Sequence, residues 1–148
     1  MRILDATAGA RAVWFDKTYP DAIYIDIREG LHPDNRRMDC RSTTFRSRSF
    51  DLVVFDPPHM TCGPRSQMAR RYGHWLTTEI RETVRGAFVE FYRILKPDGL
   101  VAFKWNDHDT ALSAVLPSQG FDALVGVPTA QRTKHSSTTY WCLLRRKP

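Results

Sequence analysis

The sequence predicts an α/β domain with a mostly parallel sheet and helices on both faces, and three observations carry this prediction. Strand-like apolar runs alternate with helix-like segments along nearly the whole chain. Residues 52–55 are continuously apolar, which is typical of a strand buried on both faces. The last two strand-like runs have no helix between them, so they predict an antiparallel hairpin at one edge of the sheet.

The N-terminal third predicts a strand, turn and helix of the kind that binds nucleotides. Residues 2–7 form the expected strand, 8–10 a turn of small residues and 11–19 a helix that ends before Pro20. The backbone of such a turn can approach a ligand closely, although only Gly9 is a glycine and the full G-x-G-x-x-G pattern is absent. The element is therefore a weak nucleotide signal by itself.

Two further strands place acids at the same edge of the sheet. Residues 22–27 predict a second strand, with Asp26 near its end, where an acid holds ribose hydroxyls in folds of this kind. A turn or helix cap is the other interpretation of Asp26. Residues 38–43 predict a short third strand, which would bring Asp39 and Cys40 to where an adenine ring binds.

The second half of the chain completes the alternation. The clearest helix is expected over residues 77–95, because apolar residues recur there at helical spacing and residues 96–99 form a turn after it. Further strands are expected over 100–105, 121–127 and 138–145, with a helix over 110–116 and a polar, basic loop over 129–137.

The strand over 52–55 ends in Asp56-Pro57-Pro58-His59. Proline has no N–H and a fixed φ, so the two prolines stop the strand and stiffen the backbone after it. A carboxylate, rigid carbonyl groups and an aromatic ring are thereby held at the carboxyl edge of the sheet, where open α/β sheets bind ligands. A plain Pro-Pro turn at the end of a strand is the alternative.

The charge distribution indicates a polyanionic partner. The chain has 148 residues, which suits one domain, and its formal net charge is +6. Arginine dominates, and its planar fork suits phosphates and stacks on bases. Residues 61–76 combine basic and aromatic side chains, as expected for a loop that covers a site, although an ordinary surface connection is the alternative. Basic residues crowd three segments in particular: Arg36, Arg37, Arg41, Arg46 and Arg48; Arg65, Arg70 and Arg71; Arg132, Lys134 and His135.

Cysteine usage and hydropathy narrow the class of protein further. No two of the three cysteines have C-x-x-C spacing, so we expect free thiols and no metal site. No apolar run is long enough to span a bilayer, and the N-terminus lacks the layout of a signal peptide. We therefore expect a cytoplasmic protein without a membrane partner.

Four motifs in order give the chain a resemblance to class I S-adenosylmethionine-dependent methyltransferases, over nearly its whole length. Residues 3–9 (ILDATAG) resemble the cofactor-binding first motif, and Asp26 matches the ribose-binding acid. Asp56-Pro57-Pro58-His59 resembles the (D/N/S)-P-P-(Y/F/W/H) motif of amino-methyltransferases, and residues 94–100 match a helix-to-strand turn of the superfamily. The resemblance implies a three-layer Rossmann-like fold, in which a seven-stranded sheet is mostly parallel and its last strand is antiparallel. Residues 104–106 and 132–135 also resemble a group of minimal bacterial and phage methyltransferases.

The resemblance implies specific roles. Asp56, Pro57, Pro58 and His59 would be catalytic: the Asp56 carboxylate and Pro57 carbonyl hold the amine, and His59 stacks on the target ring. The cofactor S-adenosyl-L-methionine, with product S-adenosyl-L-homocysteine, would contact Asp5, Ala6, Thr7, Gly9, Asp26, Asp39, Cys40 and Asp56. The nucleic acid would contact Arg65, Arg70, Arg71, Tyr72, Trp105, Arg132 and Lys134.

The expected function is methylation of an exocyclic nucleobase amine, with adenine N6 in RNA favoured. RNA is favoured over DNA because no separate target-recognition domain is evident in residues 1–148. DNA adenine-N6 or cytosine-N4 methylation is one alternative, and a non-catalytic RNA-binding subunit on the same fold is another. A homodimer or a heteromeric partner stays open.

Overall fold

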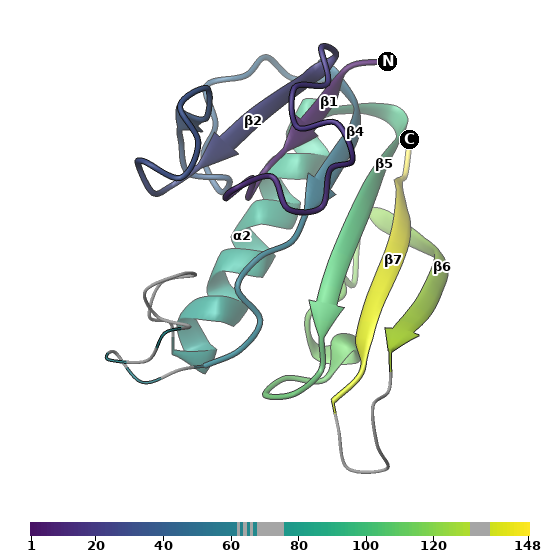
Figure 1. The fold of residues 1–148 in the computed structure, drawn as a ribbon. Helices are drawn as coiled ribbons and strands as arrows, with labels where there is room; N and C mark the ends of the chain where they lie inside the picture. The colour runs from purple at the N-terminus through teal and green to yellow at the C-terminus, as the bar shows by residue number, and fades with distance from the viewer. Residues whose placement is uncertain (62, 64, 66, 68–75, 131–136) are drawn as a thin grey trace.

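Seven strands form one mixed sheet in the computed structural model, in the order β3-β2-β1-β4-β5-β7-β6 (Figure 1). The structure describes all residues except 62, 64, 66, 68–75 and 131–136. The first five strands pair in parallel, whereas β7 is inserted antiparallel between β5 and β6. The predicted fold class is thereby confirmed. The strands are β1 (Ile3–Asp5), β2 (Ala22–Asp26), β3 (Arg36–Arg37), β4 (Phe50–Phe55), β5 (Leu95–Asn106), β6 (Phe121–Ala130) and β7 (Thr139–Arg146).

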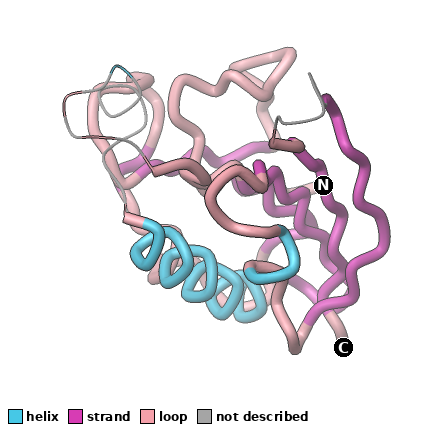
Figure 2. Tube along the Cα trace, turned by 90° about the horizontal axis from the view of Figure 1, so that it is seen from below, coloured by secondary structure: helices cyan, strands magenta, loops and turns pink. Residues whose placement is uncertain are grey.

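Helix α2 (Thr77–Ile94) covers one face of the sheet, as the apolar spacing predicts. Figure 2 shows it lying along one side of the strands. Its buried face meets the central strands through aromatic rings: the Phe91 centroid lies 4.9 Å from that of Phe55, and the Phe88 centroid 5.4 Å from that of Phe103. This aromatic contact is the centre of the core.

Residues 11–19 form an irregular segment that packs on the other face of the sheet, near β1 and β2. The helix predicted over 11–19 is therefore wrong. Arg11 has a φ of 56°, which does not continue a helix. Its guanidinium is buried, lies 3.6 Å from the centroid of the Tyr24 ring and donates from Nε to Asn35 Oδ1 at 3.0 Å. Trp14 packs edge-on against Tyr24, at 5.2 Å between centroids. These contacts with β2 outweigh the local helical propensity.

Three other elements differ from the prediction. β3 is two residues long and precedes the predicted span of 38–43, although Asp39 and Cys40 still follow it. In place of a helix over 110–116 there is a 3₁₀ turn, η1 (Leu112–Ala114), in which the Ala114 N–H donates to the Ala111 carbonyl. The Thr110 carbonyl accepts a hydrogen bond from Trp105 Nε1 at 2.8 Å rather than from the backbone of a helix. β5 begins at Leu95 rather than 100 and has an irregularity between its pairings with Phe50 and Leu52.

None of the helices that the structure describes is long and apolar enough to cross a membrane.

Candidate active site

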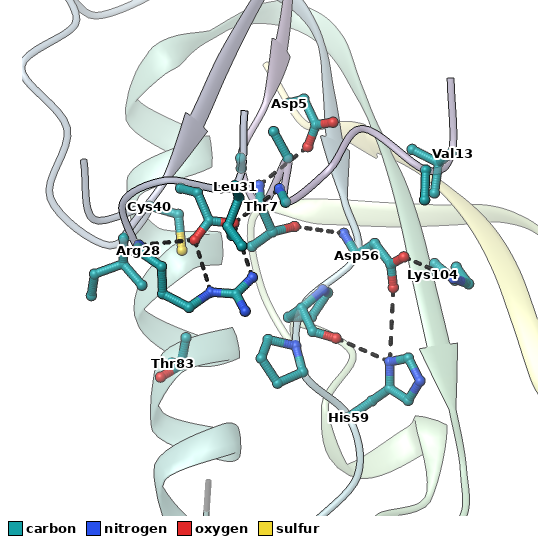
Figure 3. A pocket seen from close by; sticks show the side chains of 18 of the residues that line it. Asp5, Thr7, Val13, Arg28, Leu31, Cys40, Asp56, His59, Thr83 and Lys104 are labelled. Carbon is teal, nitrogen blue, oxygen red and sulfur yellow. Dashed lines mark hydrogen bonds and ion pairs between the residues drawn. The ribbon is translucent and has the colours of Figure 1, made fainter. Parts of the chain in front are cut away.

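A cavity of about 370 Å³ lies at the carboxyl ends of β1, β2 and β4 (Figure 3). The parallel strands end together at this edge, so side chains that are far apart in the sequence converge there. The cavity is large enough for a small organic ligand. Its lining includes both predicted groups of residues, namely Asp5, Ala6, Thr7, Gly9, Asp26, Asp39 and Cys40 of the cofactor group and Asp56, Pro57, Pro58 and His59 of the catalytic group.

The turn after β1 bends back onto the end of β2. The Gly9 N–H donates to Asp26 Oδ2 at 2.9 Å, and the φ of 52° at Gly9 is a value that glycine adopts at little cost. Arg28 also binds the Asp26 carboxylate, with Nε 3.1 Å from Oδ1 and Nη2 3.3 Å from Oδ2. A ligand that uses this carboxylate must therefore share it with Arg28 or displace the guanidinium.

Asp5 is buried beneath the turn. Its carboxylate accepts hydrogen bonds from Trp14 Nε1 at 2.7 Å and from the Thr7 N–H at 3.2 Å. Burial raises the pKa of Asp5 to about 7, and the two hydrogen bonds oppose this shift. The Thr7 hydroxyl in turn accepts from the Asp56 N–H at 2.9 Å, which fixes the end of β1 against the end of β4.

Asp39 and Cys40 form the wall of the cavity that follows β3. Hydrogen bonds from Arg41 lower the pKa of the Asp39 carboxyl, and the two side chains form an ion pair at 2.7 Å. Burial raises the pKa of the Cys40 thiol to about 12, so the thiol stays protonated near neutral pH. Cys40 therefore offers this wall a small apolar surface rather than a nucleophile.

The Asp-Pro-Pro-His segment presents three functional groups to the opposite side of the cavity. Asp56 Oδ2 accepts from Lys104 Nζ at 2.7 Å, and His59 Nδ1 lies 3.8 Å from Asp56 Oδ1 (Figure 3). His59 Nδ1 is also 3.0 Å from the Pro57 carbonyl oxygen, which can only accept, so Nδ1 carries the proton. Burial lowers the pKa of His59, which makes the neutral ring the form present at neutral pH.

Lys104 is the functional residue that the sequence reasoning missed. It lies on β5 between Phe103 and Trp105, which are both fully buried, and it points to the other face of the sheet. The signal was available, because a lysine near the carboxyl end of an otherwise apolar strand needs a partner when it is buried.

Trp105 was expected to contact nucleic acid, and the structure contradicts this. The residue has no exposed surface, and its indole donates to the Thr110 carbonyl. Its ring packs edge-on against His59, at 6.0 Å between centroids, so it supports that ring from behind. Strand alternation turns Trp105 into the core, on the side away from Lys104.

The remaining nucleic-acid residues are placed in part. Arg65 is exposed. The residues of this group that lie outside the described part of the chain are Arg70, Arg71, Tyr72, Arg132 and Lys134.

In the described part of the chain, no group of three or more His, Cys, Asp or Glu side chains is arranged to hold a metal ion.

The fold is that of S-adenosylmethionine-dependent methyltransferases, as similarity to solved structures indicates. A methyltransferase of this class from Methanosarcina mazei matches with a TM-score of 0.61 at 12% identity, over 99% of this chain and 92% of that one. An rRNA methylase from Streptococcus thermophilus matches with a TM-score of 0.56 at 11% identity, over 99% and 87%. A 1,6-didemethyltoxoflavin-N1-methyltransferase from Burkholderia thailandensis, solved with S-adenosylhomocysteine, matches with a TM-score of 0.60 at 14% identity, over 99% and 71%. No family model and no curated protein sequence matches the chain.

Proposed function

We propose that this protein is an S-adenosylmethionine-dependent methyltransferase that acts on an exocyclic amine of a nucleobase, with adenine N6 in RNA as the favoured target. The observation that carries the proposal is the position of Asp56-Pro57-Pro58-His59 on the wall of the same cavity as Gly9 and Asp26. One cavity thus joins acceptors for an amine to the groups that would hold a cofactor.

The residues around Gly9 fit the cofactor. Asp26 offers a carboxylate for the ribose hydroxyls, the backbone at Gly9 leaves room for close approach, and Cys40 gives an apolar surface for the adenine. S-adenosyl-L-methionine would supply an electrophilic methyl group there and leave as S-adenosyl-L-homocysteine.

The oxygens of Asp56 and Pro57 suit an amine whose lone pair is delocalised into a ring. Such a nitrogen needs acceptors for both of its N–H bonds rather than a strong base. Lys104 holds Asp56 Oδ2, which leaves Oδ1 for the amine. The Pro57 carbonyl accepts from His59 Nδ1 with one lone pair and has a second lone pair for the amine. Oriented acceptors supply much of the rate in reactions of this type, and Asp56 Oδ1 would receive the proton that the amine loses.

His59 and the charge of the chain favour a nucleobase over a small metabolite. The neutral imidazole, supported by Trp105, would stack on the target ring. RNA is favoured because its single-stranded loops present unstacked bases, whereas a duplex base must first be flipped out at a cost of about a few kcal/mol. The formal net charge of +6 would attract either polymer.

The test is transfer of labelled methyl groups from S-adenosylmethionine to separate rRNA, tRNA and DNA pools. We expect label in an RNA pool, with transfer lost in Asp56→Ala and kept in Asp122→Ala, which replaces a half-buried carboxylate on the outer strand β6, far from the cavity. Label only in DNA would support the DNA alternative.

The non-catalytic alternative is tested by calorimetric titration with S-adenosylmethionine. A heat of binding that Asp26→Ala abolishes supports the enzyme. Absence of binding by the folded protein would favour a scaffold role and contradict the proposal.

A further inference from the structure

One row of arginines follows the exposed side of helix α2. Arg81, Arg85 and Arg93 occupy positions separated by multiples of four, so they form a row that winds gradually across the exposed side of the helix. At 1.5 Å per residue the row is about 18 Å long. Val89, which completes the spacing, is 70% exposed, and this side of α2 therefore faces away from the core.

The segment 41–49 lies beside this row and adds three more arginines. A Cβ on Gly86 of α2 would lie 3.3 Å from the Arg41 side chain. Farther along, the Thr43 N–H donates to Glu90 Oε1 at 2.8 Å, and Arg93 Nη1 donates to the Phe45 carbonyl at 2.7 Å. The Arg48 N–H then donates to the Arg93 carbonyl at 3.0 Å. Together, the exposed side of α2 and segment 41–49 form a surface that we call the arginine strip: Arg41, Arg46, Arg48, Arg81, Arg85 and Arg93.

The strip has an excess of positive charge. Arg41 and Arg93 are paired with Asp39 and Glu90, and α2 also carries the exposed carboxylates of Glu79 and Glu82. Of the residues that the structure describes, no carboxylate forms an ion pair with the remaining four arginines, which are all exposed: Arg46, Arg48, Arg81 and Arg85.

Hydroxyl groups are interleaved with these guanidinium groups. Ser42, Thr44 and Ser47 are exposed on segment 41–49. Arginine forks and serine or threonine hydroxyls are among the side chains that contact phosphates in nucleic-acid complexes. A linear series of both groups fits a polymer with regularly spaced phosphates.

The strip begins at the wall of the candidate active site. Arg41 lines the cavity, and so does Thr83, which is on the buried side of α2, turned away from Arg81 and Arg85. From there the strip follows α2 toward the opposite edge of the sheet, where Arg48 lies just before β4 (Figure 1). A strand bound along it would pass beside the cavity mouth.

We propose that the arginine strip binds the phosphate backbone of the RNA whose target base enters the cavity. This inference rests on the function proposed above, because it takes the substrate to be RNA. It assigns binding of the RNA phosphates to segment 41–49 and to the side of α2 that faces away from the sheet. Sequence-independent contacts of this kind position a substrate without selecting a base.

The experiment measures binding of a fluorescently labelled, mixed-sequence single-stranded RNA across a salt series. The test protein is the full chain with Arg46→Gln, Arg48→Gln, Arg81→Gln and Arg85→Gln combined. The matched control is Arg145→Gln, because Arg145 is also exposed and forms its ion pair with Asp122, on the strands at the other end of the sheet. Thermal unfolding by circular dichroism establishes that both variants are folded.

We expect the combined variant to bind RNA at least tenfold more weakly at low salt. The slope of log affinity against log salt should become shallower by about 0.7 for each phosphate that the variant no longer binds, while Arg145→Gln should keep the slope of the parent. An unchanged slope in the combined variant, or an equal weakening in Arg145→Gln, would overturn the proposal.

Methyl transfer to RNA separates this inference from the proposed function. A raised KM for RNA with an unchanged kcat in the combined variant supports RNA binding by the arginine strip, because the four substituted residues do not line the cavity where methyl transfer would occur. Transfer with an unchanged KM would overturn the strip and leave the function standing. Strip-dependent RNA binding by a protein that methylates no pool would overturn the function and leave the strip standing.

Discussion

Lys104 Nζ lies 2.7 Å from Asp56 Oδ2, which makes a lysine on β5 the partner of the carboxylate that ends β4. Both side chains are largely buried at the cavity, and only one carboxylate oxygen is used by the lysine. The pair therefore sets the direction of the other oxygen. In the proposed reaction that oxygen is an acceptor for the substrate amine.

Replacing Lys104 should lower the efficiency of methyl transfer more than the affinity for the cofactor. We expect Lys104→Met to lower kcat/KM by about tenfold to a hundredfold, because a hydrogen bond to a charged group contributes about 1.5–3 kcal/mol. The Kd for S-adenosylhomocysteine, measured by calorimetry, should change little. Lys96→Met is the matched control, since Lys96 forms an ion pair of the same 2.7 Å length with Asp51 at the other edge of the sheet. Equal effects of the two substitutions would contradict a specific role for Lys104.

Arg28 should compete with the cofactor for Asp26. The guanidinium binds both carboxylate oxygens, so its removal frees them for ribose hydroxyls. We expect Arg28→Ala to lower the calorimetric Kd for S-adenosylhomocysteine about threefold to tenfold, and Asp26→Asn to raise it by at least about tenfold. Weaker binding in Arg28→Ala would mean that the guanidinium itself contacts the cofactor.

Asp5 should make stability fall as pH rises. Its pKa is about 7 in the folded protein against 3.8 for the free side chain, so the folded state binds more protons between these values. Its contribution is complete below the unfolded pKa and is lost as pH rises through about 7. From about pH 5 to about pH 8, the parent should lose about 2–3 kcal/mol relative to Asp5→Asn, which cannot titrate. Urea unfolding at both pH values measures this, and parallel pH profiles would contradict it.

His59 should act through its ring and not as an acid. Base stacking contributes about 1–3 kcal/mol, so His59→Ala should lower kcat/KM for RNA about tenfold to a hundredfold, whereas His59→Tyr should retain most activity. Burial lowers the pKa of His59, so the ring is already neutral above about pH 6.5. In that range the pH–rate profiles of the parent and His59→Tyr should therefore have the same shape. A Tyr variant as inactive as the Ala variant would point to proton transfer by the imidazole.

The sequence predicts the sheet well because its signals are local. The apolar strand before Asp56 and the apolar spacing of Ile80, Val84 and Phe91 specify β4 and α2 directly. Alternation along the chain then orders most of the sheet. The same logic brings Asp5, Asp26 and Asp56 to one edge, because parallel strands end together.

The parts that the sequence does not predict depend on tertiary contacts. Arg11 and Trp14 leave the helical conformation because Tyr24, Asn35 and Asp5 bind them. β3 consists of two exposed arginines and has no apolar pattern to recognise. The apolar strand around Lys104 indicates that this lysine needs a partner, but the partner, Asp56, is 48 residues away on β4. Only the register between β4 and β5 identifies that pairing.

The identity of the methylated nucleoside tests most directly what Asp56, Pro57 and His59 do. RNA incubated with the protein and S-adenosylmethionine is digested to nucleosides and analysed by mass spectrometry beside an Asp56→Ala reaction. We predict N6-methyladenosine in the first digest and none above background in the second. Cofactor binding with no methylated nucleoside in any RNA or DNA pool, or equal product in Asp56→Ala, would contradict the proposed function.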